Sequence, residues 1–281
     1  AKTGIGFAAL LVSLGGAYGS GSGVDLVPNR AVYDLTLDPD TLGTTITGVR
    51  GRIVQEFSGN PCDGYSNSMR WVARLTDGAG EVNVDDIRFA SWEDEKGENF
   101  QYQSKRYRNQ EIVEDVSVRA SAGAGNAAGR AKVRRPTDSN VVLPPETIFP
   151  TTHLRHIIQA AQAGKSIWQD TVYDASDDGR QVYTTLAVIS ASSPANAPAL
   201  STQISQKLAG IASWRVTVGY YNGAKGGAGG GEEVPVFEQT FTLYANGISA
   251  GLRLGYGKVV MRGKLVALDY LAEAPCELSD G

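Results

Sequence analysis

The chain has 281 residues, of which 42% are hydrophobic and 20% charged, and its formal net charge is −4. This balance provides no general attraction to nucleic acid or to anionic lipid. No apolar run approaches the ~18 residues that a membrane-spanning helix needs, so the sequence predicts no membrane span. The 34 glycines and 11 prolines are spread between short segments, as turn residues are in a protein built of strands.

The N-terminal residues 1–19 are predicted to be a signal peptide. The apolar run at 5–14 has the length of the hydrophobic region of such a leader and is too short to span a bilayer comfortably. Lys2 supplies a short charged region before it, and Ala17 and Gly19 provide a cleavage site of small residues. The alternative is a buried N-terminal helix, which the glycines in and after the run disfavour.

The residues after the predicted signal peptide are assigned to a linker and a single domain. The sequence begins at Ala1 instead of Met, which is compatible with an incomplete leader. Residues 20–26 are predicted to be a flexible linker and not a dinucleotide-binding fingerprint, because no strand precedes them and no helical pattern follows. Residues 27–281 are predicted to form a single all-β domain that is large enough for a proper core.

Segments of alternating apolar and polar residues predict strands along most of this domain. They cover residues 27–38, 45–57, 68–76, 81–92, 99–108, 112–120 and 130–135, and then 166–173, 181–190, 213–221, 234–245, 248–256 and 258–272. Turns such as Asn246-Gly247 separate them. We therefore expect an antiparallel arrangement of about a dozen or more strands, without βαβ units, in which side chains such as Trp71 point inward.

Three stretches interrupt the strand pattern. The prolines at 144, 145 and 150 are expected to prevent regular strand pairing over residues 141–150. Residues 192–208 are rich in proline and alanine and are expected to hold a short helix from Leu200. The glycine-rich residues 225–231 are interpreted as a mobile hairpin tip, since the loop at 223–227 lacks the Gly-Lys-Ser/Thr end of a phosphate-binding loop.

One convincing amphipathic helix is predicted, at residues 151–163. Its apolar residues have helical spacing and should pack against the sheet: Leu154, Ile157, Ile158 and Ala161. Thr151 or Thr152 is expected to cap the helix, and Gly164 to end it. This single helix is expected to plug one end of the sheet.

Two spacings resemble metal sites. His153 and His156 are three residues apart, whereas a metal-binding pair is usually four apart or has a third ligand, so we interpret them as part of a solvated helix face. Four residues stand at positions of a calcium-binding loop: Asp174, Ser176, Asp178 and Gly179. Thr185 replaces the final glutamate of that loop, so an acidic hairpin turn is the simpler interpretation. We predict no bound metal and no cofactor.

Charged clusters offer further candidates. Carboxylates that could act as a catalytic pair in glycoside hydrolysis are Asp85, Asp86, Glu93, Asp94 and Glu95. Acidic residues of this kind are far more often simply solvated. A basic aromatic patch consists of Tyr102, Lys105, Arg106, Tyr107 and Arg108. Outside the cytoplasm it would suit anionic envelope polymers or lipid headgroups, although a solvated strand face is the simpler interpretation. The sequence has no Gly-x-Ser-x-Gly motif of a serine hydrolase.

The chain contains two cysteines, Cys62 and Cys276, near opposite ends of the predicted domain. Two cysteines so far apart are too few for a zinc site and do not form a Cys-x-x-Cys redox motif. In an oxidising compartment they would form a disulfide between an early turn and the chain end. In a reducing compartment they would be two unrelated buried thiols.

Several short phrases stand in a recognisable order along the chain. They are PNRAVY at 28–33, GRIVQEF at 51–57, CDGY at 62–65, WED at 92–94, YRN at 107–109, LPP at 143–145, FPT at 149–151, YD at 173–174 and PC at 275–276. In this order they resemble the EipB family, periplasmic cell-envelope integrity proteins of alphaproteobacteria that were long catalogued as a domain of unknown function. The resemblance covers roughly residues 24–278, and the glycine-rich insert at 225–231 departs from it.

The resemblance carries several expectations. It implies a disulfide between Cys62 and Cys276 and a long antiparallel β-spiral, like an open barrel, similar in outline to lipoprotein carriers. It also implies a non-enzymatic, periplasmic role in cell-envelope integrity, through an envelope lipid, a lipoprotein or a periplasmic partner protein. It supplies no catalytic residues. The alternative is an envelope polysaccharide or lipid hydrolase that uses the acidic residues named above.

Overall fold

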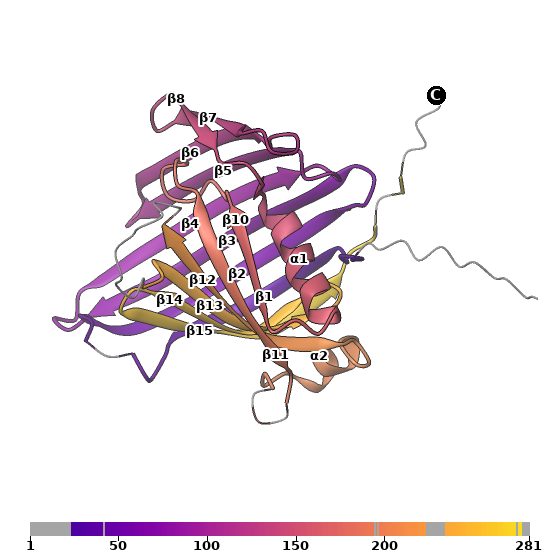
Figure 1. Cartoon of the computed structure of the whole chain (residues 1–281). Helices are drawn as coiled ribbons and strands as arrows, with labels where there is room; N and C mark the ends of the chain where they lie inside the picture. The colour runs from indigo at the N-terminus through magenta and orange to yellow at the C-terminus, as the bar shows by residue number, and fades with distance from the viewer. Residues whose placement is uncertain are drawn as a thin grey trace, which may run out of the picture.

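A computed structural model describes residues 24–41, 43–193, 195, 197–222, 234–273 and 275–276. They form one fifteen-stranded sheet in the order β8-β7-β6-β5-β4-β3-β2-β1-β15-β14-β13-β12-β11-β10-β9 (Figure 1). The first eight strands are β1 Asn29–Leu37, β2 Ile46–Asn60, β3 Gly64–Asp77, β4 Val82–Glu93, β5 Asn99–Arg108, β6 Glu111–Ser121, β7 Gly129–Arg135 and β8 Ser139–Leu143. The others are β9 Thr147–Ile148, β10 Ile167–Val172, β11 Tyr183–Ala191, β12 Ser213–Asn222, β13 Phe237–Tyr244, β14 Ser249–Tyr256 and β15 Val259–Tyr270.

The chain enters this sheet in the middle. β1 lies between β2 and β15, so the first half of the chain adds strands outward to β8, and the second half returns from the other edge to β15. Among the described strands, all neighbours run antiparallel except β9 and β10. Residues 144–146 alone link β8 to β9, so the two edges must lie close together. The sheet is therefore a nearly closed barrel, which confirms the all-β spiral and the predicted number of strands.

An apolar cluster closes the seam between the two edges. Phe149, directly after β9, stacks on Phe100 of β5 with ring centroids 5.0 Å apart, and the Tyr173 ring meets Phe100 edge-on. The Tyr173 hydroxyl donates a hydrogen bond to the Gly179 carbonyl. Gly179 has a φ of +77° and lies so close to Val118 of β6 that a larger residue would clash. Side chains thus hold the two edges of the barrel together.

The strand register sets the inner face of the barrel. Tyr33 of β1 lies opposite Ile53 of β2, and Ile53 lies opposite Trp71 of β3. Tyr33 and Ile53 are buried in one apolar cluster, and Trp71 packs against that cluster. The inward orientation predicted for Trp71 is confirmed, because neighbouring residues in register share a face of the sheet.

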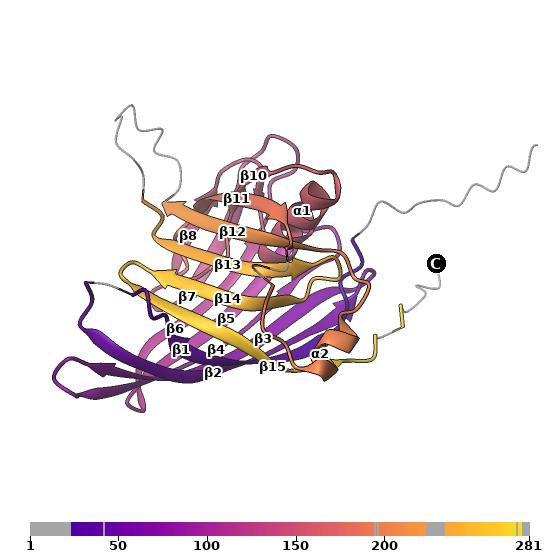
Figure 2. The ribbon, with the colours of Figure 1, turned by 90° about the horizontal axis from the view of Figure 1, so that it is seen from below.

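Two helices occupy one end of the barrel (Figure 2). Helix α1 spans Pro150–Gln162 and buries Ile157 and Ile158, which confirms the predicted helix within one residue. Helix α2 spans Thr202–Lys207, and its Ile204 packs beside β1, β14 and β15. We call this end of the barrel the helix end. The opposite end, where turns join β3 to β4, β5 to β6 and β14 to β15, is the hairpin end.

A disulfide joins the β2–β3 turn to the C-terminal segment at the helix end. Cys62 and Cys276 are bonded, with Cα atoms 5.7 Å apart, and the bond closes a loop of 214 residues. The Asn60 side chain shapes the turn, since its Oδ1 accepts hydrogen bonds from the backbone nitrogens of Cys62 and Asp63, each at 2.8 Å. The pairing implied by the family resemblance is confirmed.

Two predicted boundaries are wrong. β8 and β9 form where prolines were expected to prevent pairing over 141–150, because Pro144 and Pro145 follow β8 and do not interrupt it. Val24 and Leu26, placed in the predicted flexible linker 20–26, are buried in the core. The predicted signal peptide at 1–19 and the glycine-rich stretch at 225–231 lie outside the described residues. None of the described helices is long and apolar enough to cross a membrane.

Candidate ligand-binding site

A carboxylate on the sheet fixes the start of α1. Glu93, the last residue of β4, accepts hydrogen bonds from the backbone nitrogens of Thr151 (2.7 Å) and Thr152 (2.9 Å) and from the Thr152 hydroxyl. Our prediction that Thr151 or Thr152 caps the helix is wrong, since the N-cap residue is Phe149 and makes no side-chain cap. Glu93 instead pairs N–H groups that the first turn leaves free, at the positive end of the helix dipole. Burial raises the pKa of Glu93.

Two histidines attach α1 to the sheet. Our prediction of a solvated helix face is wrong for His153, which is only 5% exposed and has its Nε2 3.1 Å from the Thr185 hydroxyl. Burial lowers the pKa of His153 to about 4. The Nδ1 of His156 lies 3.2 Å from the Asp170 carboxylate, which also accepts a hydrogen bond from the Trp168 indole. Within the described part of the chain, no three His, Cys, Asp or Glu side chains are grouped to hold a metal ion.

A cavity of about 330 Å³ lies inside the barrel beside α1. Its apolar and aromatic lining includes Phe89, Phe100, Tyr102, Leu154, Ile157, Val172, Tyr220 and Phe241. Its polar lining consists of Asn67, Ser91, His153, Asp174, Ser176 and Gln239. The walls come from both halves of the sheet, and α1 forms one side. This size and mixture are typical of small-molecule sites, which measure about 300–1,000 Å³.

An aromatic belt crosses the interior between this cavity and the hairpin end. It consists of Tyr183, Tyr220, Phe237, Tyr256 and Trp71, and the ring centroids in this order lie 5.9, 5.4, 4.6 and 5.8 Å apart. Tyr220 belongs to both the belt and the cavity wall. Tyr256 is 43% exposed, although it shares a face of β14 with the buried Leu254. The Tyr256 end of the belt is therefore accessible to solvent.

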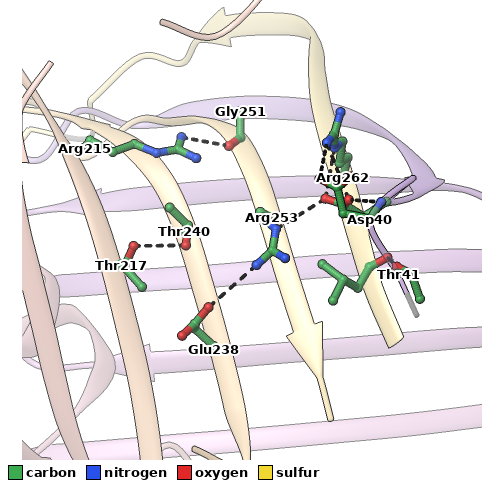
Figure 3. Close-up of polar contacts among 11 residues, drawn as sticks. Asp40, Thr41, Arg215, Thr217, Glu238, Thr240, Gly251, Arg253 and Arg262 are labelled. Atoms are coloured by element: carbon green, nitrogen blue, oxygen red, sulfur yellow. Dashed lines mark hydrogen bonds and ion pairs between the residues drawn. The ribbon is translucent and has the colours of Figure 1, made fainter. Parts of the chain in front are cut away.

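Polar groups on the outer face of the sheet pair with one another (Figure 3). Over β13 and β14 the Arg253 guanidinium lies 3.7 Å from the Glu238 carboxylate, and the Thr217 hydroxyl lies 3.0 Å from that of Thr240. Arg253 also lies 3.3 Å from the buried carboxylate of Asp38. These polar side chains on the outer face therefore have partners within the protein.

Several polar atoms of the cavity wall, in contrast, have no partner among the described residues. The Asn67 amide oxygen accepts a hydrogen bond from Gln55, but its amide nitrogen has none. The Gln239 amide nitrogen donates to the Tyr220 hydroxyl at 3.0 Å, and the Gln239 amide oxygen accepts none. The Ser91 hydroxyl makes no hydrogen bond, and none of these three atoms is fully covered by protein. They are available to a ligand.

The candidate catalytic carboxylates have structural roles. Asp85 faces the interior and accepts hydrogen bonds from two arginines of β5, whereas its neighbour Asp86 faces outward and pairs with Arg70 and Arg88. Hydrogen bonds from Arg88 and Arg70 lower the pKa of Asp86 to about 2. Glu93 holds α1, and Asp94 accepts hydrogen bonds within its own turn. The structure does not bring any of these carboxylates together as a pair.

The acidic residues of the 174–179 turn also separate. Asp174 accepts a hydrogen bond from the backbone nitrogen of Ser176 at 2.9 Å, Asp177 accepts one from the Tyr183 hydroxyl at 2.9 Å, and Asp178 pairs with Arg180. Burial raises the pKa of Asp174, which lines the cavity. These side chains satisfy their own turn and do not converge on one point, so the interpretation as an acidic turn fits the structure better than a calcium loop.

The predicted basic aromatic patch is divided between the two faces of β5. Tyr102 and Arg106 face the interior, in register with Ser91 and Ile87 of β4. Tyr107 faces outward, where the Arg88 guanidinium lies 5.1 Å from the centre of its ring. The patch is not one surface because successive residues of a strand point to opposite sides.

Sequence reasoning predicted an open barrel capped by a helix, but it did not locate the cavity or identify its lining, and it missed most of the belt. The signal that could have found the belt is the aromatic residue on the inward face of each of four successive strands, β11 to β14: Tyr183, Tyr220, Phe237 and Tyr256. The same alternation would describe a solid core, so the pattern alone does not reveal a hollow.

The fold and this hollow define a barrel-like all-β protein made of one spiral sheet. The chain belongs to the EipB-like family, whose model matches residues 20–272. It is 35% identical over 254 residues to the cell envelope integrity protein EipB of Brucella abortus (strain 2308). The aligned region covers 90% of this chain and 88% of that protein. A crystal structure of a beta-barrel-like protein of domain of unknown function DUF1849 from Brucella abortus matches with a TM-score of 0.79 and 34% identity, over 89% of this chain and all of that one.

Proposed function

We propose that this chain maintains the integrity of the cell envelope as a non-catalytic, periplasmic protein that binds an envelope component inside its barrel. The related protein of Brucella abortus is named for cell envelope integrity, and the two sequences align over most of their lengths. The observation that carries the binding role is the cavity of about 330 Å³ beside α1, with aromatic walls and polar atoms that have no partner among the described residues. A sheet that only needed to be stable would fill this space, because cavities reduce stability.

Catalysis receives less support from the geometry. The carboxylates of Asp85, Asp86 and Glu93 are each held by two or more hydrogen bonds within the fold, and they face different directions. A general acid or base needs to reach the reacting group of a substrate. Among the described residues that line the cavity, Asp174 supplies the single carboxylate, so this lining does not offer the pair of carboxylates that most glycoside hydrolases use.

A substitution that fills the cavity tests the proposal. Ser91 faces the cavity from β4, and the next residue back, Ala90, is exposed on the outer face of the same strand. We expect Ser91→Trp to occupy the cavity and to abolish envelope resistance when it replaces the wild type in a deletion strain. Ala90→Trp, the matched control, should restore it fully. Detergent and antibiotic sensitivity are the readouts, and thermal unfolding checks that both variants fold. A folded Ser91→Trp variant with wild-type resistance would refute the proposal.

A further inference from the structure

We infer that the ligand of the barrel interior is an uncharged saccharide, an inference that rests on the proposed function and names its ligand class. Three features of the cavity support it: aromatic rings that are not fully buried, unpaired hydrogen-bonding atoms on several strands, and the absence of lysine and arginine from its described lining. Each feature is separate from the others, and together they distinguish a sugar ring from an acyl chain or an anionic headgroup.

Aromatic rings line the cavity on two sides. Phe89 and Tyr102 lie on one half of the sheet, with ring centroids 5.8 Å apart, and Tyr220 lies on the other half. None of the three is fully buried. The C–H faces of a pyranose ring pack on the faces of aromatic rings, and the belt continues this surface from Tyr220 through Phe237 to Tyr256. The wall therefore offers a series of aromatic faces on which consecutive sugar rings can pack.

The unpaired polar atoms match hydroxyl groups. Asn67 offers an N–H donor, Gln239 offers a carbonyl acceptor, and the Ser91 hydroxyl can do either. A saccharide hydroxyl both donates and accepts, so neighbouring hydroxyls of one ring can satisfy all three. An acyl chain would displace water from these atoms and leave them unpaired, which costs binding free energy.

The charge of the cavity disfavours an anion. Its lining, as far as the structure describes it, contains no lysine or arginine, and its one carboxylate is that of Asp174. A fatty acid carboxylate or a lipid phosphate would enter without a cationic partner and close to an acid. An uncharged sugar meets no such penalty. At about 30 Å³ per water, the cavity holds roughly eleven water volumes, which is room for roughly one or two pyranose rings.

The inference is tested by titrating the full chain with four neutral probes: cellotetraose, maltotetraose, laminaritetraose and tetra-N-acetylchitotetraose. Calorimetry and saturation-transfer NMR should show saturable binding of at least one of them. Phe89→Leu keeps an apolar side chain but removes an aromatic face, and should weaken this binding by roughly tenfold. Ser91→Ala removes only a hydroxyl and should weaken it roughly threefold or more. Ala90→Trp should bind like the wild type.

Other outcomes overturn the inference. If none of the four probes binds, or if binding is unchanged in both Phe89→Leu and Ser91→Ala, the ligand is not a saccharide held by this wall. If palmitate or phosphatidylglycerol vesicles bind instead, and Phe89→Leu leaves that binding intact, the ligand is a lipid. In either case, loss of envelope resistance in Ser91→Trp would still support a ligand-binding function of the cavity. A Ser91→Trp variant that folds and retains full envelope resistance would contradict both the ligand-binding function and the saccharide inference.

Discussion

The two ends of the barrel interior are built from the same alternating strands, yet they are packed differently. At the helix end, Ile158 of α1 and Leu243 of β13 are fully buried. Toward the hairpin end, a small cluster of Val49, Ala73 and Met261 is buried. Other inward residues there, such as Ile87 and Phe237, are only partly buried, and Tyr256 is 43% exposed. Strand alternation therefore decides which way a side chain points, whereas added layers of structure decide whether it is covered.

Those added layers gather at one end. α1, α2, the segment around Leu26 and the disulfide between Cys62 and Cys276 all lie at the helix end. A sheet of fifteen strands encloses more space than its own side chains fill, and among the described residues only the helix end receives helices that fill it. We therefore assign the stability of the fold to the helix end and ligand binding to the hollow that lies between α1 and the hairpin end.

A pair of identical substitutions should show the contrast most strongly. Ile158→Ala at the helix end should cost about 4 kcal/mol of unfolding free energy, because it leaves a cavity in a fully buried site. Ile87→Ala, on the inward face of β4, should cost about 1 kcal/mol, because that side chain is only partly buried. Urea unfolding of both variants measures the two values. Equal losses would contradict the assignment of stability to the helix end.

The disulfide should have the next largest effect. The double substitution Cys62→Ser and Cys276→Ser should lower the unfolding free energy by about 3 kcal/mol, below the ~5 kcal/mol that loop entropy allows for so long a loop. Thermal unfolding with and without reductant measures it. Reductant should destabilise the wild type and leave the double variant unchanged. Thiol titration of the unfolded, non-reduced protein that detects two free thiols would disprove the bond.

Acid should act on the helix end through His153. Burial lowers the pKa of His153 to about 4, while in the unfolded chain it is near the ordinary value of about 6.5. The unfolded chain therefore binds a proton first as the pH falls, so stability is full above pH ~6.5 and is lost progressively down to pH ~4. The loss should amount to about 3 kcal/mol.

Two variants isolate this effect. His153→Asn keeps a polar side chain near Thr185 and should flatten the fall in stability between pH 7 and pH 4.5, as measured by urea unfolding at each pH. His156→Asn, one turn of helix away and partly exposed, leaves His153 in place and should keep the wild-type slope. An unchanged slope in His153→Asn would show that another group causes the acid sensitivity.

Ion pairs on the outer face should contribute least. The Arg52 and Asp34 side chains lie 2.7 Å apart and are both largely solvated. Arg52→Ala should change the unfolding free energy by less than about 0.5 kcal/mol, since an exposed pair gains little and is screened by salt. A loss above about 2 kcal/mol in urea unfolding would mean that the outer face, and not the packed helix end, dominates stability.

Sequence patterns predicted local features of this fold well. The alternation around Tyr33 and Ile53 identified the inward face, and the spacing of Ile157 and Ile158 identified α1. Both patterns depend on neighbours along the chain and on the fixed periods of strand and helix. The disulfide was reached through the family resemblance, because the distance along the chain between two cysteines does not reveal their distance in space.

Features that depend on distant partners were missed. Glu93 caps helix α1, which begins 57 residues later in the chain. His153 is buried because Thr185 and Tyr220 pack against it. A polar residue on a helix is ordinarily taken as solvated, and only the tertiary structure shows that a sheet covers it. The open barrel was expected, but the position of the cavity could not be predicted for the same reason, because the alternation of residues in single strands does not reveal how densely the interior is packed.

Native mass spectrometry of the protein purified from cells that express it naturally is the decisive experiment for a ligand in the barrel interior. We predict that the wild type carries a small-molecule adduct in the mass range of an oligosaccharide and that Ala90→Trp carries it at equal occupancy. Ser91→Trp, folded but with its cavity filled, should lack the adduct. An adduct that Ser91→Trp retains at wild-type occupancy, or its absence from the wild type, would contradict a ligand held in the hollow beside α1.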